Sequence, residues 1–307
     1  MKRVLLTGAS GFIGTHCITA LVERGFEVHT ASRRPLSFDS ARVQTHQVDL
    51  LDSKQHRALL EAVAPSHLLH LAWTMKPGGL LYVDPENYAW VAASFNLVRE
   101  FVELGGKRLV VGGSSAEYDW RYGYCSESIT PLVPETVYGT CKHALQLLIS
   151  SFANQTNLSS AWARVFFSYG PHEHPARFVA SIIRSLLGDR PAPCSHGQQI
   201  RDYLHIQDIA SALVSLLESD LRGPVNIASG QAVTLERIAT TIGQLLGKPE
   251  LIRLGALPAR SNDHAMVVGR NERLVSELAW SPSFDLLSGL QNTIDWWERN
   301  PPNPERA

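Results

Sequence analysis

A glycine-rich turn between an apolar run and an amphipathic segment is the feature that most constrains how this chain folds. Residues 4–6 are apolar and predict a buried strand, and the apolar spacing over 16–24 predicts a helix. Between them stand Gly8, Gly11 and Gly14. In a strand–turn–helix unit the first glycine makes the turn, the second lets the backbone approach a pyrophosphate, and the third lets helix and strand pack closely. The stretch therefore predicts a dinucleotide-binding turn, with a turn that serves packing alone as the alternative.

The composition is that of an ordinary globular protein and excludes several other classes. The 307 residues suit one large or two fused domains, 44% of them are hydrophobic, and a net charge of −1 gives no electrostatic signature of nucleic-acid or membrane binding. No apolar run reaches membrane-spanning length, and a strand that starts at residue 4 leads us to expect no signal peptide. The four cysteines lack metal-binding or disulfide spacing. We therefore expect a cytoplasmic protein without a metal site.

Strands and helices alternate along the first half of the chain. The predicted strands cover 4–6, 27–31, 46–50, 67–73 and 108–112, and the predicted helices 16–24, 54–64, 86–104, 178–187 and 234–246. This rhythm is typical of an α/β protein with a Rossmann-type, doubly wound parallel sheet. Ligands of such sheets bind beyond the carboxyl ends of the strands.

The residues that follow the second and third predicted strands bear on the cofactor. Ser32-Arg33-Arg34 stands where an acidic residue would accept hydrogen bonds from a ribose hydroxyl and favour NAD. An arginine pair suits a 2′-phosphate instead, so NADP(H) is the predicted preference and NAD(H) the second choice. Two solvated loop arginines are the alternative interpretation. Asp49 ends the third predicted strand, where it is placed to meet an adenine.

A tyrosine and a lysine stand one helical turn apart. Tyr138 and Lys142 occupy positions i and i+4 of a predicted helix and share one face. At about 4 Å and an effective dielectric constant of about 20, a cation favours a phenolate by roughly 4 kcal/mol, which brings the pKa of a phenol toward neutrality. Such a tyrosine exchanges a proton with an alcohol or a ketone. A hydroxyl of the Ser114-Ser115 pair after the fifth strand can hold the same oxygen.

Taken together, these motifs resemble a known family. The chain is similar over essentially its whole length to extended short-chain dehydrogenase/reductases of the nucleotide-sugar epimerase/dehydratase type. The matching stretches are 7–14, His-Leu-Ala at 70–72, Ser114-Ser115, 138–142, 164–171, 201–208 and 226–230. The resemblance implies an enzyme that moves hydride between a nicotinamide and a sugar carbon. A non-enzymatic dinucleotide sensor built on the same fold is the alternative.

The resemblance also assigns roles to individual residues. It makes Ser115 the catalytic hydroxyl, with Ser114 as second choice, Tyr138 the acid/base, and Lys142 its partner and a ligand of the nicotinamide ribose. The cofactor residues that it implies are Gly8, Ser10, Gly11, Phe12, Ile13, Gly14, Arg33, Arg34, Asp49, Leu50, Leu71, Ala72, Tyr138 and Lys142. The substrate residues that it implies are Ser114, Glu117, Phe167, Arg177 and Arg201, with an arginine facing the diphosphate of a nucleotide sugar.

Domain organisation and assembly follow from the same resemblance. We expect a dinucleotide-binding domain from 1–168 and 200–230, and a smaller substrate-binding lobe from 169–199 and 231–307. A homodimer is expected through the helix that begins at Glu86 and the helix that contains Tyr138.

Departures from the family pattern bear on the reaction. Phe167 and Trp90 stand where the family commonly has asparagine, and Ala116 stands where its 4,6-dehydratases have aspartate. Loss of that acid weakens the expectation of water elimination. A reductase consumes reduced cofactor at each turn, for which NADPH is the usual donor, so the arginine pair favours an NADPH-dependent 4-ketoreductase. An NAD(P)-dependent epimerase or dehydratase acting on a nucleotide-linked sugar is the alternative.

Overall fold

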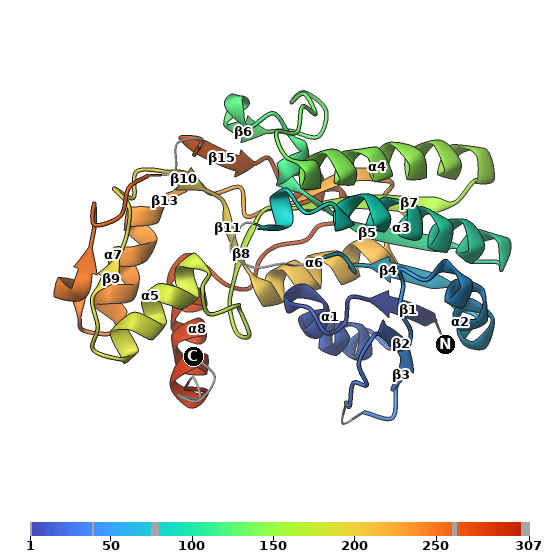
Figure 1. The fold of residues 1–307 in the computed structure, drawn as a ribbon, viewed down its shortest axis with the longest axis horizontal. Helices are drawn as coiled ribbons and strands as arrows, with labels where there is room; N and C mark the ends of the chain where they lie inside the picture. Colours follow the sequence, from blue (N-terminus) through green and yellow to red (C-terminus); the bar gives the residue numbers. More distant parts are fainter. Residues whose placement is uncertain (1, 39, 75–79, 260–262, 302–307) are drawn as a thin grey trace.

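A parallel sheet forms the centre of the molecule. The computed structural model describes residues 2–38, 40–74, 80–259 and 263–301, and within them seven parallel strands pair in the order β3-β2-β1-β4-β5-β7-β12 (Figure 1). The strands are β1 (Arg3–Thr7), β2 (Glu27–Ser32), β3 (Val43–Gln47), β4 (His67–His70), β5 (Arg108–Ser114), β7 (Ser159–Val165) and β12 (Gly223–Ile227). The order reverses between β1 and β4, which is the switch point where doubly wound sheets bind ligands. The expected Rossmann-type sheet is confirmed.

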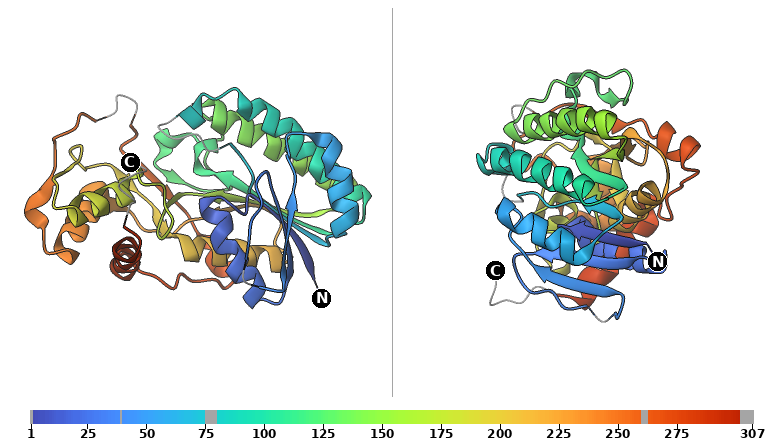
Figure 2. Two further views of the ribbon diagram at one scale, coloured as in Figure 1. Left: turned by 60° about the horizontal axis from the view of Figure 1, so that its bottom comes forward. Right: turned by 90° about the vertical axis from the view of Figure 1, so that its right-hand side faces the viewer.

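Helices cover both faces of this sheet (Figure 2). α1 (Phe12–Glu23) and α6 (Ile206–Glu218) pack on one face, and their apolar sides share one core cluster. α2 (His56–Val63), α3 (Glu86–Glu103) and α4 (Val137–Thr156) pack on the other face and share a second cluster. Because both faces are covered, the central strands are almost continuously apolar, as expected for a parallel sheet.

Two strands end earlier than their sequence pattern suggests. β3 runs from Val43 to Gln47 rather than over 46–50, so Asp49 lies in the turn beyond it. β4 ends at His70 rather than at 73. The amide of Leu71 still donates to the Thr7 carbonyl at 3.2 Å, and the Thr7 hydroxyl also accepts the amides of Leu71 and Ala72 at 3.1 and 3.2 Å. Both endings place side chains at the carboxyl edge of the sheet.

The second half of the chain builds a smaller lobe around its own core. α5 (Phe178–Leu187), α7 (Leu235–Leu245) and α8 (Leu286–Arg299) pack their apolar faces together. The predicted bounds of α5 are confirmed, and those of α7 differ by one residue at each end. Pairs of short strands frame the lobe: β8 (Phe167–Tyr169) with β11 (Tyr203–His205), and β9 (Ala192–Pro193) with β14 (Ile252–Arg253).

A four-stranded sheet joins this lobe to the first half of the chain. Its order is β13 (Val233–Thr234), β10 (Ile200–Arg201), β15 (Met266–Gly269) and β6 (Tyr124–Cys125). β6 follows β5 in the sequence, yet it pairs with β15 from the C-terminal part of the chain. The domain boundary expected at 168 assigns β6 to the dinucleotide-binding domain, although β6 pairs within the sheet of the lobe.

The remaining global features concern membranes and cysteines. None of the helices in the described parts of the chain has the length and apolar character needed to cross a bilayer. Cys17, Cys125, Cys141 and Cys194 are free thiols and all are buried. Among the described residues, no cluster of histidine, cysteine and carboxylate side chains has the geometry to hold a metal ion.

Candidate active site

The glycine-rich turn forms a tight cradle between β1 and α1. Gly8 has a φ of +75°, and a Cβ there would lie 2.7 Å from the amide nitrogen of Ala72. A Cβ at Gly14 would lie 2.1 Å from the carbonyl oxygen of Gly8, so α1 packs directly on the turn. The amide of Gly11 donates to the Gly8 carbonyl at 2.9 Å, and α1 begins at Phe12 with its first amides free. This geometry fits a bound pyrophosphate for the reasons expected from the sequence.

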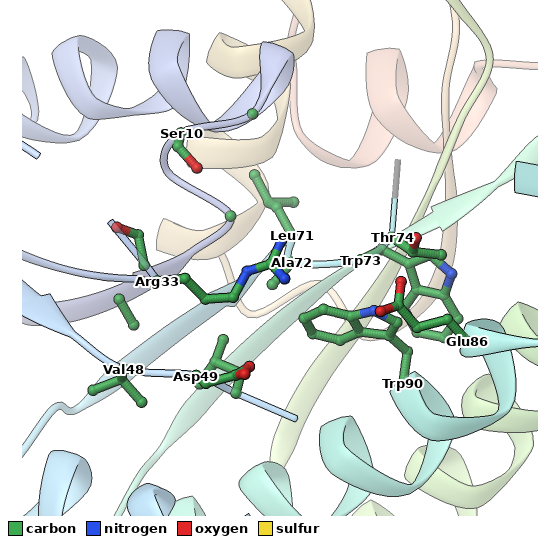
Figure 3. Close-up of a pocket in the computed structure, with 15 residues that line it drawn as sticks. Ser10, Arg33, Val48, Asp49, Leu71, Ala72, Trp73, Thr74, Glu86 and Trp90 are labelled. Atoms are coloured by element: carbon green, nitrogen blue, oxygen red, sulfur yellow. The ribbon is translucent and has the colours of Figure 1, made fainter. Parts of the chain in front are cut away.

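A cavity of about 430 Å³ opens from this turn across the switch point of the sheet (Figure 3). Its walls come from the carboxyl ends of β1, β2, β3 and β4 and from the start of α3. It is lined by Gly8, Ser10, Gly11, Ala31, Ser32, Arg33, Val48, Asp49, Leu50, Leu71, Ala72, Trp73, Thr74, Glu86 and Trp90. Eight of the residues implied as cofactor ligands are among these. A cavity of this size and place, with a glycine cradle at one end, fits a dinucleotide.

The remaining implied cofactor ligands differ in their placement. Phe12, Ile13 and Gly14 form the first turn of α1 beneath the cradle. Arg33 extends its side chain across the cavity, whereas Arg34 is exposed and its carbonyl accepts a hydrogen bond from the Ser32 hydroxyl (Figure 3). The structure thus brings one arginine of the pair, not both, into the cavity.

The start of α4 presents Tyr138 to the end of β5. Thr136 caps the helix by accepting the amide of Gly139 at 3.0 Å. A Cβ at Gly139 would lie 2.2 Å from the carbonyl oxygen of Ala116, so only glycine allows α4 to approach this closely. A side-chain hydrogen bond joins Tyr138 to Ser114, the residue that ends β5. This contact brings the predicted acid/base and a hydroxyl together.

Of the two serines, Ser114 is the one that the structure places against Tyr138. Ser114 is half-buried, and its Oγ also accepts the amide of Ala116 at 3.2 Å. Ser115, the first choice from the sequence, is buried, and its carbonyl accepts the indole N–H of Trp120 at 2.6 Å. The sequence ranked Ser115 first and Ser114 second, whereas the contact with Tyr138 favours Ser114.

Lys142 lies beneath the tyrosine but not against its hydroxyl. Its Nζ donates to the carbonyl oxygen of Gly112 at 2.7 Å and lies 6.0 Å from the centroid of the Tyr138 ring. Burial lowers the pKa of Lys142 to about 7. Burial also raises the pKa of Tyr138, while its hydrogen bond to Ser114 and the charge of Arg177 lower it in part. The pKa direction predicted for Tyr138 from the i, i+4 spacing is therefore wrong for the free site, because loss of hydration exceeds the attraction of a cation at this distance.

Glu117 faces the interior instead of a substrate. Its carboxylate accepts the backbone amide of Ser114 at 2.7 Å, the indole N–H of Trp162 at 2.9 Å and the Nε of Arg164 at 2.9 Å. Both Glu117 and Arg164 are at most 1% exposed. Glu117 thus neutralises a buried arginine and fixes the backbone of Ser114, which is a positioning contact behind the site and not the substrate contact that was expected.

Arg177 lies on the side of the lobe that faces Tyr138. Its Nε lies 3.6 Å from a carboxylate oxygen of Glu173, whose side chain is 2% exposed. Burial raises the pKa of Glu173 to about 8, and the attraction of Arg177 offsets this only in part. The charge of Arg177 lowers the pKa of Tyr138 in part, so its guanidinium lies within electrostatic range of the phenol.

A second cavity of about 380 Å³ lies in the lobe. Phe167 and Arg201, two of the implied substrate residues, line it together with Tyr203 and Asp263. The guanidinium carbon of Arg201 lies 5.5 Å from the Phe167 ring centroid, and the same guanidinium is ion-paired with Asp263. This cavity combines aromatic faces with a fixed charge pair, which suits a ligand with a planar ring and polar substituents.

Two aromatic residues were not singled out as site residues from the sequence. Tyr82 makes an edge contact with Tyr138 at 6.0 Å between ring centroids. The ring of Trp73 lies 3.9 Å from Lys142 Nζ and stacks on Trp90. The only sequence signal for Trp73 was its place directly after the His-Leu-Ala stretch. Tyr82 lies in a short 3₁₀ turn and gave no periodic signal.

Comparison with known proteins agrees with this site. The sequence model of the NAD dependent epimerase/dehydratase family matches residues 4–228. The structure of MoeE5 in complex with UDP-glucuronic acid and NAD is 31% identical, covers 97% of this chain and 99% of its own, and superimposes with a TM-score of 0.85. The UDP-glucose 4-epimerase of Thermus thermophilus, solved with NAD, is 23% identical over 96% of this chain and 99% of its own, with a TM-score of 0.86. A curated relative, the UDP-glucuronate 4-epimerase of Thermodesulfobacterium geofontis, is 22% identical over 98% of this chain and 97% of its own.

The protein therefore belongs to the NAD dependent epimerase/dehydratase family, and the resemblance inferred from its motifs is confirmed. Members of this family are enzymes that use a nicotinamide dinucleotide. The relatives support the epimerase alternative better than the 4-ketoreductase that the arginine pair favoured.

Proposed function

We propose that this protein is a nucleotide-sugar epimerase that oxidises a hydroxyl-bearing carbon of its substrate and then reduces it from the opposite face. The observation that carries the proposal is the hydrogen-bonded pair of Tyr138 and Ser114 beside the dinucleotide cavity. A nicotinamide held in this cavity would supply the hydride acceptor and donor. Gly8, Gly11 and the first turn of α1 would hold its pyrophosphate, and Lys142 would reach its ribose.

The residues of the chain divide the proton chemistry between them. Tyr138 takes the proton of the sugar hydroxyl as the adjacent carbon loses hydride, and returns it when hydride comes back. Ser114 donates a hydrogen bond to the oxygen on which charge develops. The Ser114 hydroxyl and the guanidinium of Arg177 favour the ionised phenol, which burial disfavours.

Elimination of water is the less favoured reaction at this site. It needs an acid or base next to the hydroxyl that holds the sugar oxygen. Ala116 carries no ionisable group, and the carboxylate of Glu117 is bound to Arg164 and Trp162 in the interior. Glu117 therefore does not replace the aspartate that Ala116 stands in for.

The substrate class follows from the lobe. The cavity at Arg201 and Phe167 has the aromatic and charged walls that a nucleoside diphosphate needs. The MoeE5 structures hold UDP-glucuronic acid and UDP-glucose, so these two UDP-sugars are the substrates to test first.

A 4-ketoreductase is the second candidate, and Arg33 is the observation that favours it. Arg33 reaches into the cofactor cavity at the end of β2, where a 2′-phosphate of NADP would lie. We propose NAD(H) as the working cofactor with NADP(H) as the competitor. Affinities for both, in wild type and in Arg33→Ala, decide between them, since loss of a charged hydrogen bond weakens NADP binding by about 10- to 100-fold.

The decisive experiment follows one UDP-sugar without added cofactor. Protein as purified is incubated with UDP-glucuronic acid or UDP-glucose, and the anomeric proton signals are followed by NMR. Interconversion of two C4 epimers with no net cofactor consumption supports the epimerase. Product formation only from a 4-keto sugar, with one NADPH consumed per product, would establish the reductase instead. Tyr138→Phe serves as the inactive control.

We also propose that two copies associate through α3 and α4. Leu147 and Leu148 on α4 are 55% and 43% exposed, and Tyr88 on α3 is 62% exposed, whereas Leu145 is fully buried against the sheet. These exposed apolar side chains form a surface suited to a second copy. A monomeric mass over a wide concentration range in light scattering would contradict the dimer.

A further inference from the structure

Lys142 is an ionisable group in a place where positive charge is costly. Its side chain is 4% exposed, and its one hydrogen bond found among the described residues goes to the carbonyl oxygen of Gly112 at 2.7 Å. An ammonium group has three N–H bonds, so a single carbonyl does not replace its hydration. A further contact that favours positive charge therefore bears on how far the ammonium form persists.

The indole of Trp73 supplies the second contact. Its ring centroid lies 3.9 Å from Lys142 Nζ, which is well inside the range of a cation–π interaction. The ring is held in place: its Nε1 donates to Asn87 Oδ1 at 2.6 Å, and its face stacks on Trp90 at 6.1 Å with 29° between planes. Asn87 is fixed in turn by donating to the carbonyls of Leu81 and Asp84, each at 2.8 Å.

Three other described groups face Lys142, and each is already bonded to a different partner. Glu117, behind β5, favours the ammonium electrostatically, but its carboxylate is already bound to Arg164. His70 on β4 is uncharged, because burial lowers its pKa to about 3, and its ring nitrogens bond to Thr7 and Ser94 at 2.7 and 2.8 Å. On α4 itself, the neighbouring group is Tyr138, whose hydroxyl bonds to Ser114.

We propose that Trp73 is a positioning residue that holds Lys142 in its ammonium form beside Tyr138. An indole face is suited to this task because it stabilises a cation without carrying a compensating charge. A carboxylate in the same place would cancel the field that the ammonium exerts on the phenol. The catalytic consequence rests on the proposed function, whereas the effect on the lysine does not.

The test measures the titration of Lys142 directly in the full chain. The protein contains six lysines, so ¹³Cε-labelled lysine gives a simple NMR spectrum, in which the Lys142 signal is assigned by its loss in Lys142→Met. We expect Trp73→Leu to lower the pKa of Lys142 by roughly 0.5–1.5 units, since a desolvated cation–π contact is lost. Trp73→Phe keeps a weaker aromatic face and is expected to give a smaller shift in the same direction.

Trp280→Leu is the matched control, because Trp280 is also a buried indole whose Nε1 donates a hydrogen bond, but it packs in the cluster of α1 and α6 on the other face of the sheet. It is expected to leave the Lys142 titration close to that of wild type. An unchanged or raised Lys142 pKa in Trp73→Leu would overturn the proposal. If Trp73→Leu does not fold, the Trp73→Phe shift decides in its place, and a value equal to wild type overturns it.

A second readout separates this proposal from the proposed function. The alkaline limb of the pH dependence of kcat should move to lower pH in Trp73→Leu, in parallel with the lysine pKa, while Trp280→Leu keeps the wild-type limb. A protein that shows the NMR shift but turns over no nucleotide sugar would retain the role of Trp73 and reject the epimerase. Turnover of a nucleotide sugar, together with an unchanged Lys142 titration in Trp73→Leu, would support the epimerase and reject the role of Trp73.

Discussion

The cofactor cavity and the lobe cavity are built by different means, although they are of similar size. The first is walled by the carboxyl ends of consecutive parallel strands, and most of its residues stand within short stretches that follow β1, β2, β3 and β4. The second is walled by segments from 167 to 263 that belong to strands, loops and α5. Sheet topology alone gathers the residues of the first cavity, whereas the second depends on how the lobe packs.

The chemistry that we propose takes place where these two regions meet. Tyr138 and Ser114 come from the sheet side, and Arg177 comes from the lobe side. A variant can therefore affect turnover, stability, or ligand binding in one cavity alone. The expected effects differ in size.

The largest effect is expected for Tyr138→Phe, which removes the acid/base and leaves both cavities intact. Turnover should fall by about 10²- to 10⁴-fold, because proton transfer is lost from the reacting oxygen. Cofactor and UDP-sugar affinities, measured by calorimetry, should change little. Tyr82→Phe, which alters the neighbouring phenol, is the control. Wild-type rates in Tyr138→Phe would remove this residue from the mechanism.

Glu117→Gln tests the buried ion pair between Glu117 and Arg164 behind Ser114. The change leaves Arg164 charged and buried without its counter-ion, so the free energy of unfolding should fall by about 3–5 kcal/mol. Urea unfolding measures the change. Glu61→Gln breaks an exposed ion pair with Arg57 and should cost less than about 1 kcal/mol. Equal losses in the two variants would show that the buried pair has no special weight.

Ser114→Ala and Ser115→Ala decide which hydroxyl works with Tyr138. Ser114→Ala should lower kcat by about 10²-fold, the loss typical of one hydrogen bond to a developing charge. Ser115→Ala should lower it far less, because the contact made by this residue to Trp120 uses its backbone carbonyl. Steady-state kinetics of the two variants give the answer, and the reverse order would restore the assignment made from sequence.

Arg201→Ala separates the lobe cavity from the reaction. KM for a UDP-sugar should rise by roughly 10- to 100-fold, because a charged hydrogen bond is lost, while kcat stays within a few-fold of wild type. Arg253→Ala, on the exposed end of β14, controls for loss of lobe charge. A fall in kcat without a change in KM would place Arg201 with the reacting groups.

A further prediction concerns the pH dependence of stability that Glu173 causes. Its pKa is raised by burial from 4.5 to about 8, so the folded state holds this proton more tightly than the unfolded state. The stabilisation is complete below about pH 4.5 and is lost as pH rises through 8. Glu173→Gln should match wild type near pH 4.5 and unfold at higher urea near pH 8. A constant difference across this range would assign Glu173 the ordinary carboxylate behaviour of an ion pair with Arg177.

Sequence reasoning works best where structure is local. The glycine turn, the Tyr138–Lys142 face and the bounds of α5 depend on neighbours within a few residues, and each could be placed from periodicity and turn chemistry. The pKa direction of Tyr138 could not, because it depends on how much surrounding structure removes water from the phenol. The place of Glu117 likewise depends on Trp162 and Arg164, which come from another strand.

The choice between Ser114 and Ser115 shows the limit of motif matching. Both serines stand in the stretch that matches the family, and the sequence ranked Ser115 first and Ser114 second. The capping of the following 3₁₀ turn by Ser114, and the reach of Glu117 back to the Ser114 amide, fix the register in three dimensions. No pairwise spacing in the sequence carries that information.

The pairing of β6 with β15 has a consequence for how the protein is made. Tyr124 and Cys125 are synthesised long before Val268 and Gly269, the residues with which they pair. Until then, the cluster that Tyr118, Cys125 and Phe166 form with Ala228 and Val267 lacks its C-terminal members. A nascent or truncated chain that stops before β15 would therefore present an open apolar seam next to Ser114, and is a natural client for chaperones.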